Sequence, residues 1–500
     1  MLITFIAGIS AGAWVVTTLR FSSRPFRIFA YAELALAVTI GLSMFTYAYL
    51  PYWFVRLAGL LSRTEAAYPV YVLCQGVICF GVMFIPTLCL GMTLPLVSRV
   101  AASAVTEVGG AVGRVFAVNT LGTVLGTCLT GFVFLPRLGL ARTFALGVGL
   151  NTWIGLAVLF RLKGLSLAKV SGPIVVLASL IVWGSGLLFD ETWRGSLTMG
   201  MWRPGIAPST ASEFIEISRS SNIRFYRDGA GSTVSVHGER EGGPNLFLKV
   251  NGKTEASTYG DMTTQLLLAH VPMVLHPEPR NVLVVGLGSG VTAGSVAAHG
   301  RMQTLDVVEI SPDVVEGARL FSSYNRNVLN DKRLRLVIDD AKSFLLSTDK
   351  KYDLIISEPS NPWMAGVANV FSREFYAHCK AHLAPGGLMV QWVQLYEFSD
   401  AAFDVVLATF ASEFPSVNLW HTDTADLLLV GSVEPFKFEL SKVLAALAEP
   451  SVKDDLDRIG LSNPVLFLGR EVLSSGLGAL LPQEGTRQHS DYYPCLLYTS

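Results

Sequence analysis

Long runs of apolar residues fill the first 190 residues of the chain. They predict six membrane-spanning helices, near residues 2–19, 27–50, 69–97, 112–135, 143–161 and 173–189. Most of these runs reach the roughly 20 apolar residues that a bilayer core requires. Buried helices of a soluble protein could explain one such run, but not six in succession. The first run has no charged start and no following cleavage site, which indicates a span rather than a signal peptide.

The pattern changes in the second half of the chain. Short alternating segments at 223–226, 233–236 and 246–250 predict strands, and Asn251-Gly252 is a turn signal between extended segments. From about residue 261, strand and helix patterns alternate, which predicts a parallel sheet covered on both faces. We therefore expect a transmembrane helical domain over 1–190, a linker over 191–221, a small β cap over 222–260, a Rossmann-like, methyltransferase-type α/β domain over 261–440, and a C-terminal segment over 441–500. The chain ends suggest truncation at one or both termini.

Composition supports a membrane protein and argues against other classes. Hydrophobic residues make up 51% of the chain and charged residues only 15%, which is too apolar for a soluble enzyme. The net charge is −1 and no basic run occurs, so nucleic acid is not expected as a partner. The 6 cysteines and 8 histidines form no cluster with metal-ligand spacing, so we expect no metal. Glu33 lies inside the second predicted span, either as a functional acid or as a helix-end residue paired with Arg24 or Arg27.

A glycine-rich turn between two apolar strands is the most informative local motif. The strand Asn281–Val285 runs into Gly286-Leu-Gly288-Ser289-Gly290, and a second strand, 304–308, ends at the acid Glu309. Glycines let a backbone approach a ligand closely, and an acid about 20 residues further on accepts hydrogen bonds from ribose hydroxyls. The spacing predicts a nucleoside site. The alternative is a tight turn with a solvated Glu309.

Two more acids follow later strands. Asp340 comes after the strand Leu334–Ile338, and Glu358 comes after Asp353–Ser357. Ligands of such sheets bind beyond the carboxyl ends of the strands, so these acids should converge with Glu309 on one site. Asp340 fits an adenine amino group but is also a favoured helix N-cap. Glu358 fits the reactive end of the ligand, or a loop acid held by backbone amides.

The chain resembles the spermidine synthase (polyamine aminopropyltransferase) family, and most closely its membrane-anchored, multi-span relatives. The resemblance covers about 222–435. It rests on five segments: Gly260-Asp-Met-Thr-Thr-Gln-Leu-Leu-Leu-Ala-His-Val-Pro272, His276-Pro-Glu-Pro-Arg-Asn-Val-Leu-Val-Val-Gly286, Val308-Glu-Ile-Ser-Pro312, Ile338-Asp-Asp-Ala341 and Tyr352-Asp-Leu-Ile-Ile-Ser-Glu-Pro-Ser-Asn-Pro362.

This resemblance implies transfer of an aminopropyl group from decarboxylated S-adenosylmethionine, a co-substrate rather than a bound cofactor, to an amine such as putrescine. Methylthioadenosine would be released. By motif position, the implied cofactor-binding residues are Gly286, Gly288, Ser289, Gly290, Glu309, Asp340 and Gln265. Glu358 is the implied base. Asp261, Asn361 and Trp363 are expected beside the amine, and Trp363 could instead pack against the sheet.

The sequence departs from the family pattern mainly on the amine side. The family's glycine-loop acid is Ser289 here, and the tyrosine of the preceding helix is Thr264. The family's Asp-Ser-x-Asp-Pro element is Glu358-Pro-Ser-Asn361-Pro362. One acid is thus a glutamate and the other an amide, so the acceptor amine stays open.

Two other functions also stay open: an S-adenosylmethionine-dependent methyltransferase, and a membrane transporter or sensor whose nucleoside domain binds without catalysis. We expect a multi-pass protein of a bacterial inner membrane, with the lipid bilayer and a small amine as partners and a homodimer left open. Loop charges place the segment after span six outside. Because adenosyl cofactors are made in the cytosol, we expect the soluble domain on the cytoplasmic side.

Overall fold

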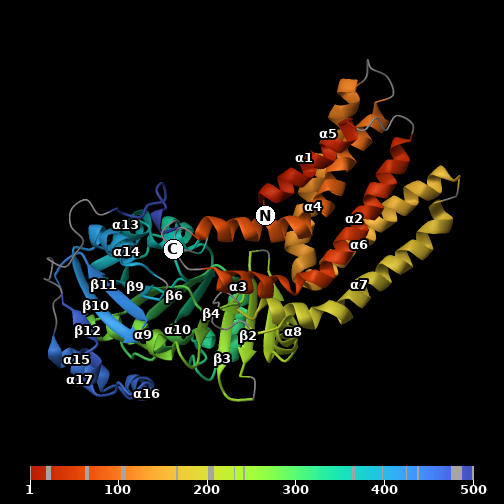
Figure 1. Cartoon of the computed structure of the whole chain (residues 1–500). Coiled ribbons are helices and arrows are strands. Elements are labelled where there is room, and N and C mark those ends of the chain that lie inside the picture. The colour runs from red at the N-terminus through yellow and green to blue at the C-terminus, as the bar shows by residue number, and fades with distance from the viewer. Residues whose placement is uncertain are drawn as a thin grey trace. The chain divides into compact units, whose positions relative to one another are not determined.

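The structure is a computed structural model of the 500-residue chain. It describes residues 2–18, 24–61, 67–102, 108–164, 167–200, 208–229, 231–239, 242–362, 364, 366–396, 398–423, 425–435, 439–474 and 487–497. The chain forms two compact units (Figure 1). Unit 1 comprises Met1–Ser235 and Val250–Lys253, and unit 2 comprises Val236–Lys249 and Thr254–Ser500.

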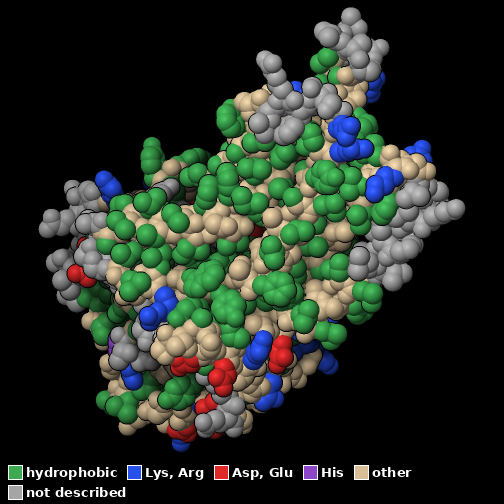
Figure 2. Space-filling view, turned by 45° about the vertical axis from the view of Figure 1, so that its right-hand side comes forward, with side chains coloured by type: hydrophobic (Ala, Val, Ile, Leu, Met, Phe, Trp, Pro, Cys, Tyr) green, Lys and Arg blue, Asp and Glu red, His purple; other side chains and the backbone are tan. Residues whose placement is uncertain are grey.

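Unit 1 is built mainly from apolar helices. These are α1 (Leu2–Thr18), α2 (Pro25–Tyr47), α3 (Leu50–Leu60), α4 (Tyr68–Ala101), α5 (Val108–Leu129), a π-helical turn (Thr130–Phe134), α6 (Leu135–Leu162), α7 (Leu167–Leu197) and the short α8 (Ala211–Arg219). Within the described residues, Pro25–Tyr47, Tyr68–Ala101 and the continuous stretch Val108–Leu162 are long and apolar enough to cross a membrane. Hydrophobic side chains crowd the molecular surface shown in Figure 2, and several are largely exposed, for example Leu42 at 62%.

The helices differ in detail from the six predicted spans. Helix α1 has 17 residues, slightly short of a full bilayer core. The predicted spans 112–135 and 143–161 lie in one continuous helical stretch, which breaks only at Gly139, where φ is 76°. The predicted span 173–189 falls on α7, whose side chains over 167–179 lie outside the described residues. Helix α7 continues into the expected linker, which also contains α8.

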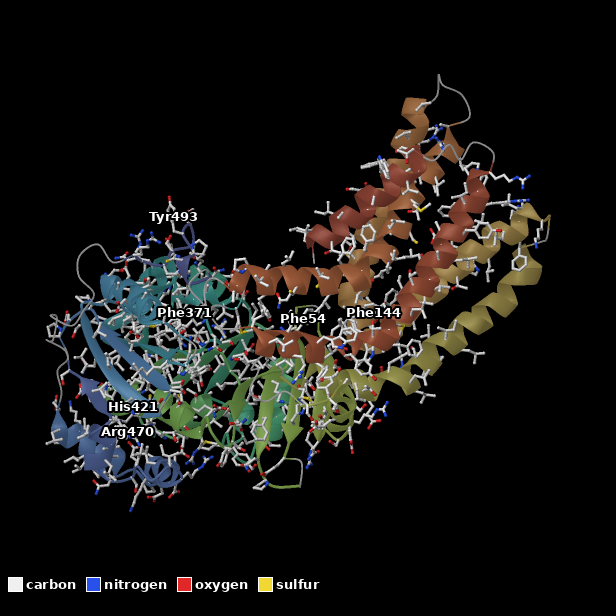
Figure 3. The ribbon with its side chains drawn as sticks, viewed as in Figure 1. Phe54, Phe144, Phe371, His421, Arg470 and Tyr493 are labelled. Atoms are coloured by element: carbon white, nitrogen blue, oxygen red, sulfur yellow. The ribbon has the colours of Figure 1, made fainter. Side chains whose placement is uncertain are left out.

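A polar group supports the helix break at Gly139. The carboxylate of Asp228 accepts the backbone N–H of Leu140 at 3.0 Å. It also accepts the hydroxyls of Tyr226 at 2.7 Å and Thr233 at 2.9 Å. A helix start leaves backbone N–H groups without intrahelical partners, so this buried carboxylate satisfies one of them. Nearby, Phe144 packs against Trp193 and Tyr47 (Figure 3).

Four strands form a small separate sheet in the order β1-β2-β3-β4. They are β1 (Ile223–Asp228), β2 (Thr233–Gly238), β3 (Leu246–Val250) and β4 (Lys253–Ser257). Asn251 and Gly252 both have positive φ, 50° and 82°, as the expected two-residue turn requires. The predicted β cap is therefore a four-stranded sheet.

Unit 2 contains an eight-stranded sheet in the order β12-β10-β11-β9-β8-β5-β6-β7. Its strands are β5 (Asn281–Val285), β6 (Thr304–Glu309), β7 (Leu334–Ile338), β8 (Tyr352–Ser357), β9 (Leu383–Gln394), β10 (Ser416–Asp423), β11 (Asp426–Ser432) and β12 (Glu471–Leu473). From β7 to β9 the pairing is parallel. Beyond β9 the sheet continues with antiparallel strands, and at that edge His421 donates its backbone N–H to Arg470 (Figure 3).

Helices cover both faces of this sheet, as the alternating pattern predicted (Figure 1). One face packs against α9 (Met262–Leu275), α10 (Val291–Ala297), α11 (Pro312–Ala318), α15 (Leu440–Leu447), α16 (Pro450–Asp457) and α17 (Pro464–Leu468). The other packs against α12 (Ala341–Ser347), α13 (Arg373–His382), α14 (Asp400–Glu413) and a 3-10 turn whose Phe371 is fully buried (Figure 3). Side chains of β5 alternate between the two faces, so Val282 and Val284 join one core and Leu283 and Val285 the other.

Candidate active site

The glycine loop between β5 and α10 turns the chain sharply at the carboxyl end of the central strand. Gly286 has φ 92°, and a Cβ there would lie 2.7 Å from the carbonyl oxygen of Glu358. Gly290 has φ 79°, and its Cβ would meet Asn325 Nδ2 at 3.0 Å. Both positions therefore need glycine for backbone conformation and for space. Asn325 fixes the loop further, because its amide donates to the Ser289 carbonyl at 2.9 Å.

Glu309 ends β6 next to this loop. One carboxylate oxygen accepts the backbone N–H of Leu287, and the other accepts that of Ser311, both at 2.9 Å. Burial raises the pKa of Glu309 above its ordinary value, while these backbone donors oppose the rise. Each carboxylate oxygen can accept a second hydrogen bond, so ribose hydroxyls can join the amides already bound.

Asp340 follows β7 and is the N-cap of α12. Its carboxylate accepts the backbone N–H groups of Lys342 at 3.1 Å and Ser343 at 3.0 Å. The cap interpretation is therefore confirmed. Both cap hydrogen bonds use Oδ1 of Asp340, which is compatible with a ligand contact through Oδ2.

Gln265 and Ser289 hold each other beneath the loop. Ser289 Oγ donates to Gln265 Oε1, and Gln265 Nε2 donates to the carbonyl of Ser257 at 2.9 Å. Gln265 is 3% exposed and Ser289 1%. The pair links α9, the glycine loop and the end of β4, and the predicted contact of Gln265 with the cofactor stays a prediction.

Glu358 comes directly after β8 and is half-buried. Thr292, in the first turn of α10, donates its hydroxyl to Glu358 Oε2 at 2.7 Å. Burial, together with the negative charges of Asp261 and Asp426, raises the pKa of Glu358 to about 8, although the hydrogen bond from Thr292 acts in the opposite direction. A carboxylate with this pKa can exchange a proton near neutral pH.

The residues that influence Glu358, or that were predicted to lie beside the amine, come from distant parts of the chain. Asp261 precedes α9, and Asn361 donates its amide to the hydroxyl of Tyr396 at 3.2 Å. Asp426, at the start of β11, accepts the hydroxyl of Thr264 at 2.8 Å. Sequence reasoning missed the roles of Thr292, Tyr396 and Asp426. Thr292 directly follows the glycine loop, whereas Tyr396 and Asp426 lie after β9, where the antiparallel strands were not anticipated.

Trp363 lies outside the described residues, so its predicted place beside the amine stays a prediction. In the described part of the chain, no group of three or more His, Cys, Asp or Glu side chains is placed to hold a metal ion.

Part of the chain is similar in sequence to proteins of one known family. Residues 262–425 match the model of the spermine/spermidine synthase domain. The polyamine aminopropyltransferase of Clostridium perfringens strain SM101 is 36% identical over 144 residues, which cover 29% of this chain and 50% of that protein. The polyamine aminopropyltransferase of Methanocaldococcus jannaschii is 34% identical over 125 residues, covering 25% and 42%. The chain thus spans about half the length of the curated relatives it matches.

Among solved structures, the spermidine synthase of Thermotoga maritima is similar, with a TM-score of 0.39 and 21% identity, covering 47% of this chain and 88% of that one. The strand order and the helices on both faces define an α/β domain with a mostly parallel sheet. More specifically, residues 262–425 match the spermine/spermidine synthase domain, and long apolar helices precede them in the chain.

Proposed function

We propose that this domain transfers an aminopropyl group from decarboxylated S-adenosylmethionine to an amine. The relatives of Clostridium perfringens and Methanocaldococcus jannaschii are polyamine aminopropyltransferases, which supports this class of reaction. The observation that carries the proposal is Glu358, a carboxylate of raised pKa beside the nucleoside residues.

The reaction needs a positioned amine and a proton acceptor. The nitrogen lone pair attacks the aminopropyl carbon next to the sulfonium. The carbon–sulfur bond breaks, its electrons return to sulfur, and neutral methylthioadenosine leaves. Glu358 accepts the proton that the acceptor ammonium loses as its nitrogen attacks, and the product nitrogen stays protonated. Holding the two reactants in line supplies much of the rate.

The raised pKa of Glu358 suits this proton transfer. An amine of pKa about 10.4 is mostly protonated at neutral pH. A carboxylate with a pKa of about 8 accepts a proton from such an amine far more readily than one near 4.5. The negative charges of Asp261 and Asp426 also attract both reactants, since the sulfonium and the ammonium are cations.

On the nucleoside side, we propose that the glycine loop and Glu309 hold the adenosyl group, with Asp340 at the adenine. Gln265 and Ser289, which are hydrogen-bonded to each other, would keep the glycine loop in position. Asp261 and Asn361 would lie beside the amine.

Release of the nucleoside product tests the proposal. Purified full-length protein is incubated with decarboxylated S-adenosylmethionine and a panel of amines, and the products are separated by chromatography. We expect methylthioadenosine only when an amine is present, and about 10²- to 10⁴-fold slower release with Glu358→Gln. Formation of S-adenosylhomocysteine from ordinary S-adenosylmethionine would instead indicate a methyltransferase, and binding without either product a sensor.

A further inference from the structure

A buried carboxylate on α16 contacts three elements that surround the glycine loop. Asp455 is 1% exposed. Its Oδ2 accepts the hydroxyl of Ser295 in α10 at 3.1 Å and lies 3.3 Å from Nε2 of His270 in α9. Its two oxygens accept two nitrogens of the Arg326 guanidinium, at 2.9 and 3.3 Å. Helix α16 lies beyond residues 262–425, so this carboxylate is an addition to the predicted site.

Arg326 belongs to a short loop whose backbone is strained. Arg326 and Asn327 have φ of 55° and 53°, in the left-handed region that residues with a Cβ rarely adopt. Because this conformation is unfavourable, other contacts must hold it in place. The guanidinium supplies them, since it binds Asp455 and also donates to the carbonyl of Ser451 in α16 at 2.7 Å. Helix α16 therefore holds a loop conformation that the local backbone does not favour.

The residue before Arg326 is the one that contacts the glycine loop. Asn325 is 1% exposed and donates its amide to the carbonyl of Ser289 at 2.9 Å. Its backbone packs so closely on α10 that a Cβ at Gly294 would lie 2.2 Å from the Asn325 carbonyl oxygen. A change of backbone conformation at Arg326 would move Asn325, and with it the hydrogen bond that fixes the Ser289 carbonyl.

A second path from Asp455 reaches the same serine through α9. This helix carries both His270 and Gln265, and Gln265 accepts the hydroxyl of Ser289. His270 is 0% exposed, and its Nδ1 lies 2.9 Å from Nε2 of His299. The carboxylate beside Nε2 favours the tautomer in which His270 accepts the N–H of His299. Both paths thus end at Ser289, one at its carbonyl and the other at its hydroxyl.

We infer that Asp455 is a positioning residue, which holds the glycine loop in its nucleoside-binding conformation through Arg326 and Asn325. The inference rests on the proposed function for the ligand of the loop. A carboxylate that only attached α16 to the domain would contribute to thermal stability without a specific effect on the loop. The two roles therefore differ in what a substitution changes.

Two substitutions at Arg326 separate these roles. Alanine and glycine both remove the guanidinium, but only glycine adopts a φ near 55° without cost. Methylthioadenosine should bind Arg326→Ala about 5- to 30-fold more weakly than the wild type, the change that corresponds to the cost of left-handed backbone. It should bind Arg326→Gly within about 3-fold of the wild type. Calorimetric titration of the full-length protein measures both. Equal weakening in the two variants would overturn the inference, because the guanidinium would then act only as a counter-charge.

A matched pair of substitutions in α16 tests the carboxylate itself. Asp455→Asn keeps the shape and removes the charge, so methylthioadenosine should bind about 10- to 150-fold more weakly, as for loss of a hydrogen bond between charged groups. In assays of turnover the KM for the nucleoside should rise while kcat changes little. The control Asp454→Asn changes the neighbouring exposed acid and should leave binding unchanged. Unchanged affinity in a folded Asp455→Asn protein would overturn the inference. If this variant does not fold, the comparison of alanine with glycine at Arg326 decides the question.

Hydrogen exchange separates this inference from the proposed function, because it needs neither turnover nor a ligand. The amide hydrogen of Leu287 is bonded to Glu309, so its exchange reports the order of the glycine loop. In protein without ligand, we expect faster exchange of this amide in Asp455→Asn and Arg326→Ala. We expect the exchange rate of the wild type in Asp454→Asn and Arg326→Gly.

The combined results distinguish the two possible failures. If this exchange pattern holds but the wild type binds no methylthioadenosine and converts no amine, the proposed function fails and α16 still positions the loop as inferred. If the wild type converts amines while all four variants exchange like the wild type, only the inference fails.

Discussion

The two sides of the candidate site are assembled in different ways. The proposed nucleoside side comes mainly from one continuous stretch, residues 281–340, which holds three adjacent parallel strands. The proposed amine side gathers Asp261, Glu358, Asn361 and Asp426 from the start of α9, the loop after β8 and the start of β11. In this proposal the first side would bind largely through backbone groups and the buried Glu309, and the second through side chains.

This difference teaches which properties of the protein can vary independently. Backbone N–H groups of the glycine loop are insensitive to side-chain identity, whereas a side-chain cluster changes its charge with a single substitution. Two departures from the family pattern, at 358 and 361, fall on the amine side, whereas the departure at Ser289 falls in the glycine loop. We therefore expect substitutions on the two sides to affect different measured quantities.

The largest expected effect is that of Glu358→Gln. Glutamine keeps the shape and can still accept the hydroxyl of Thr292, but it cannot take a proton. Turnover should fall by about 10²- to 10⁴-fold, while affinity for methylthioadenosine stays nearly unchanged. Stopped assays for turnover and calorimetry for affinity measure the two quantities. If nucleoside affinity falls as far as turnover, Glu358 belongs to the nucleoside side. The proposed division of the site into two independent sides would then be wrong.

Glu309→Ala should weaken nucleoside binding, the quantity that Glu358→Gln is expected to leave unchanged. The substitution removes the acceptor for ribose hydroxyls and for the amides of Leu287 and Ser311. Methylthioadenosine binding should weaken by about 1.5–3 kcal/mol, as for hydrogen bonds to a charged group. The KM for the amine should change little. Calorimetry that shows unchanged nucleoside affinity would contradict the role of Glu309.

The smallest predicted effect is a shift in pH dependence. Since Glu358 must be ionised to accept a proton and its pKa is about 8, kcat/KM should fall as the pH drops through that value. Asp261 raises this pKa, so Asp261→Asn should move the fall to lower pH. The amine titrates identically with both proteins, so the difference isolates Glu358. Superimposable profiles for the wild type and Asp261→Asn would rule out this electrostatic coupling.

The nucleoside side could be predicted from the sequence because its signals are local. The predicted strand 281–285 matches β5 residue for residue, and the strand 334–338 matches β7. Apolar runs ending at glycines or acids define both the strands and their functional ends. The N-cap role of Asp340 follows from the same local pattern.

The amine side could not be predicted fully because its contacts are long-range. Thr264 and Asp426 are 162 positions apart, and only the antiparallel pairing of β9 with β11 brings Gln394 beside Asp426. A second network was missed for the same reason: buried His270 contacts His299 at 2.9 Å and Asp455 at 3.3 Å. It links α9, the turn after α10, and α16, and neither spacing nor periodicity marks it.

One competition experiment tests the central claim most directly. The full-length protein receives 1,4-diaminobutane with equal concentrations of decarboxylated and ordinary S-adenosylmethionine, and the acceptor is analysed by mass spectrometry. The proposed function predicts an acceptor that has gained an aminopropyl group, together with methylthioadenosine in equal amount. An acceptor that has gained a methyl group, or one left unmodified while the nucleosides still bind, would contradict it.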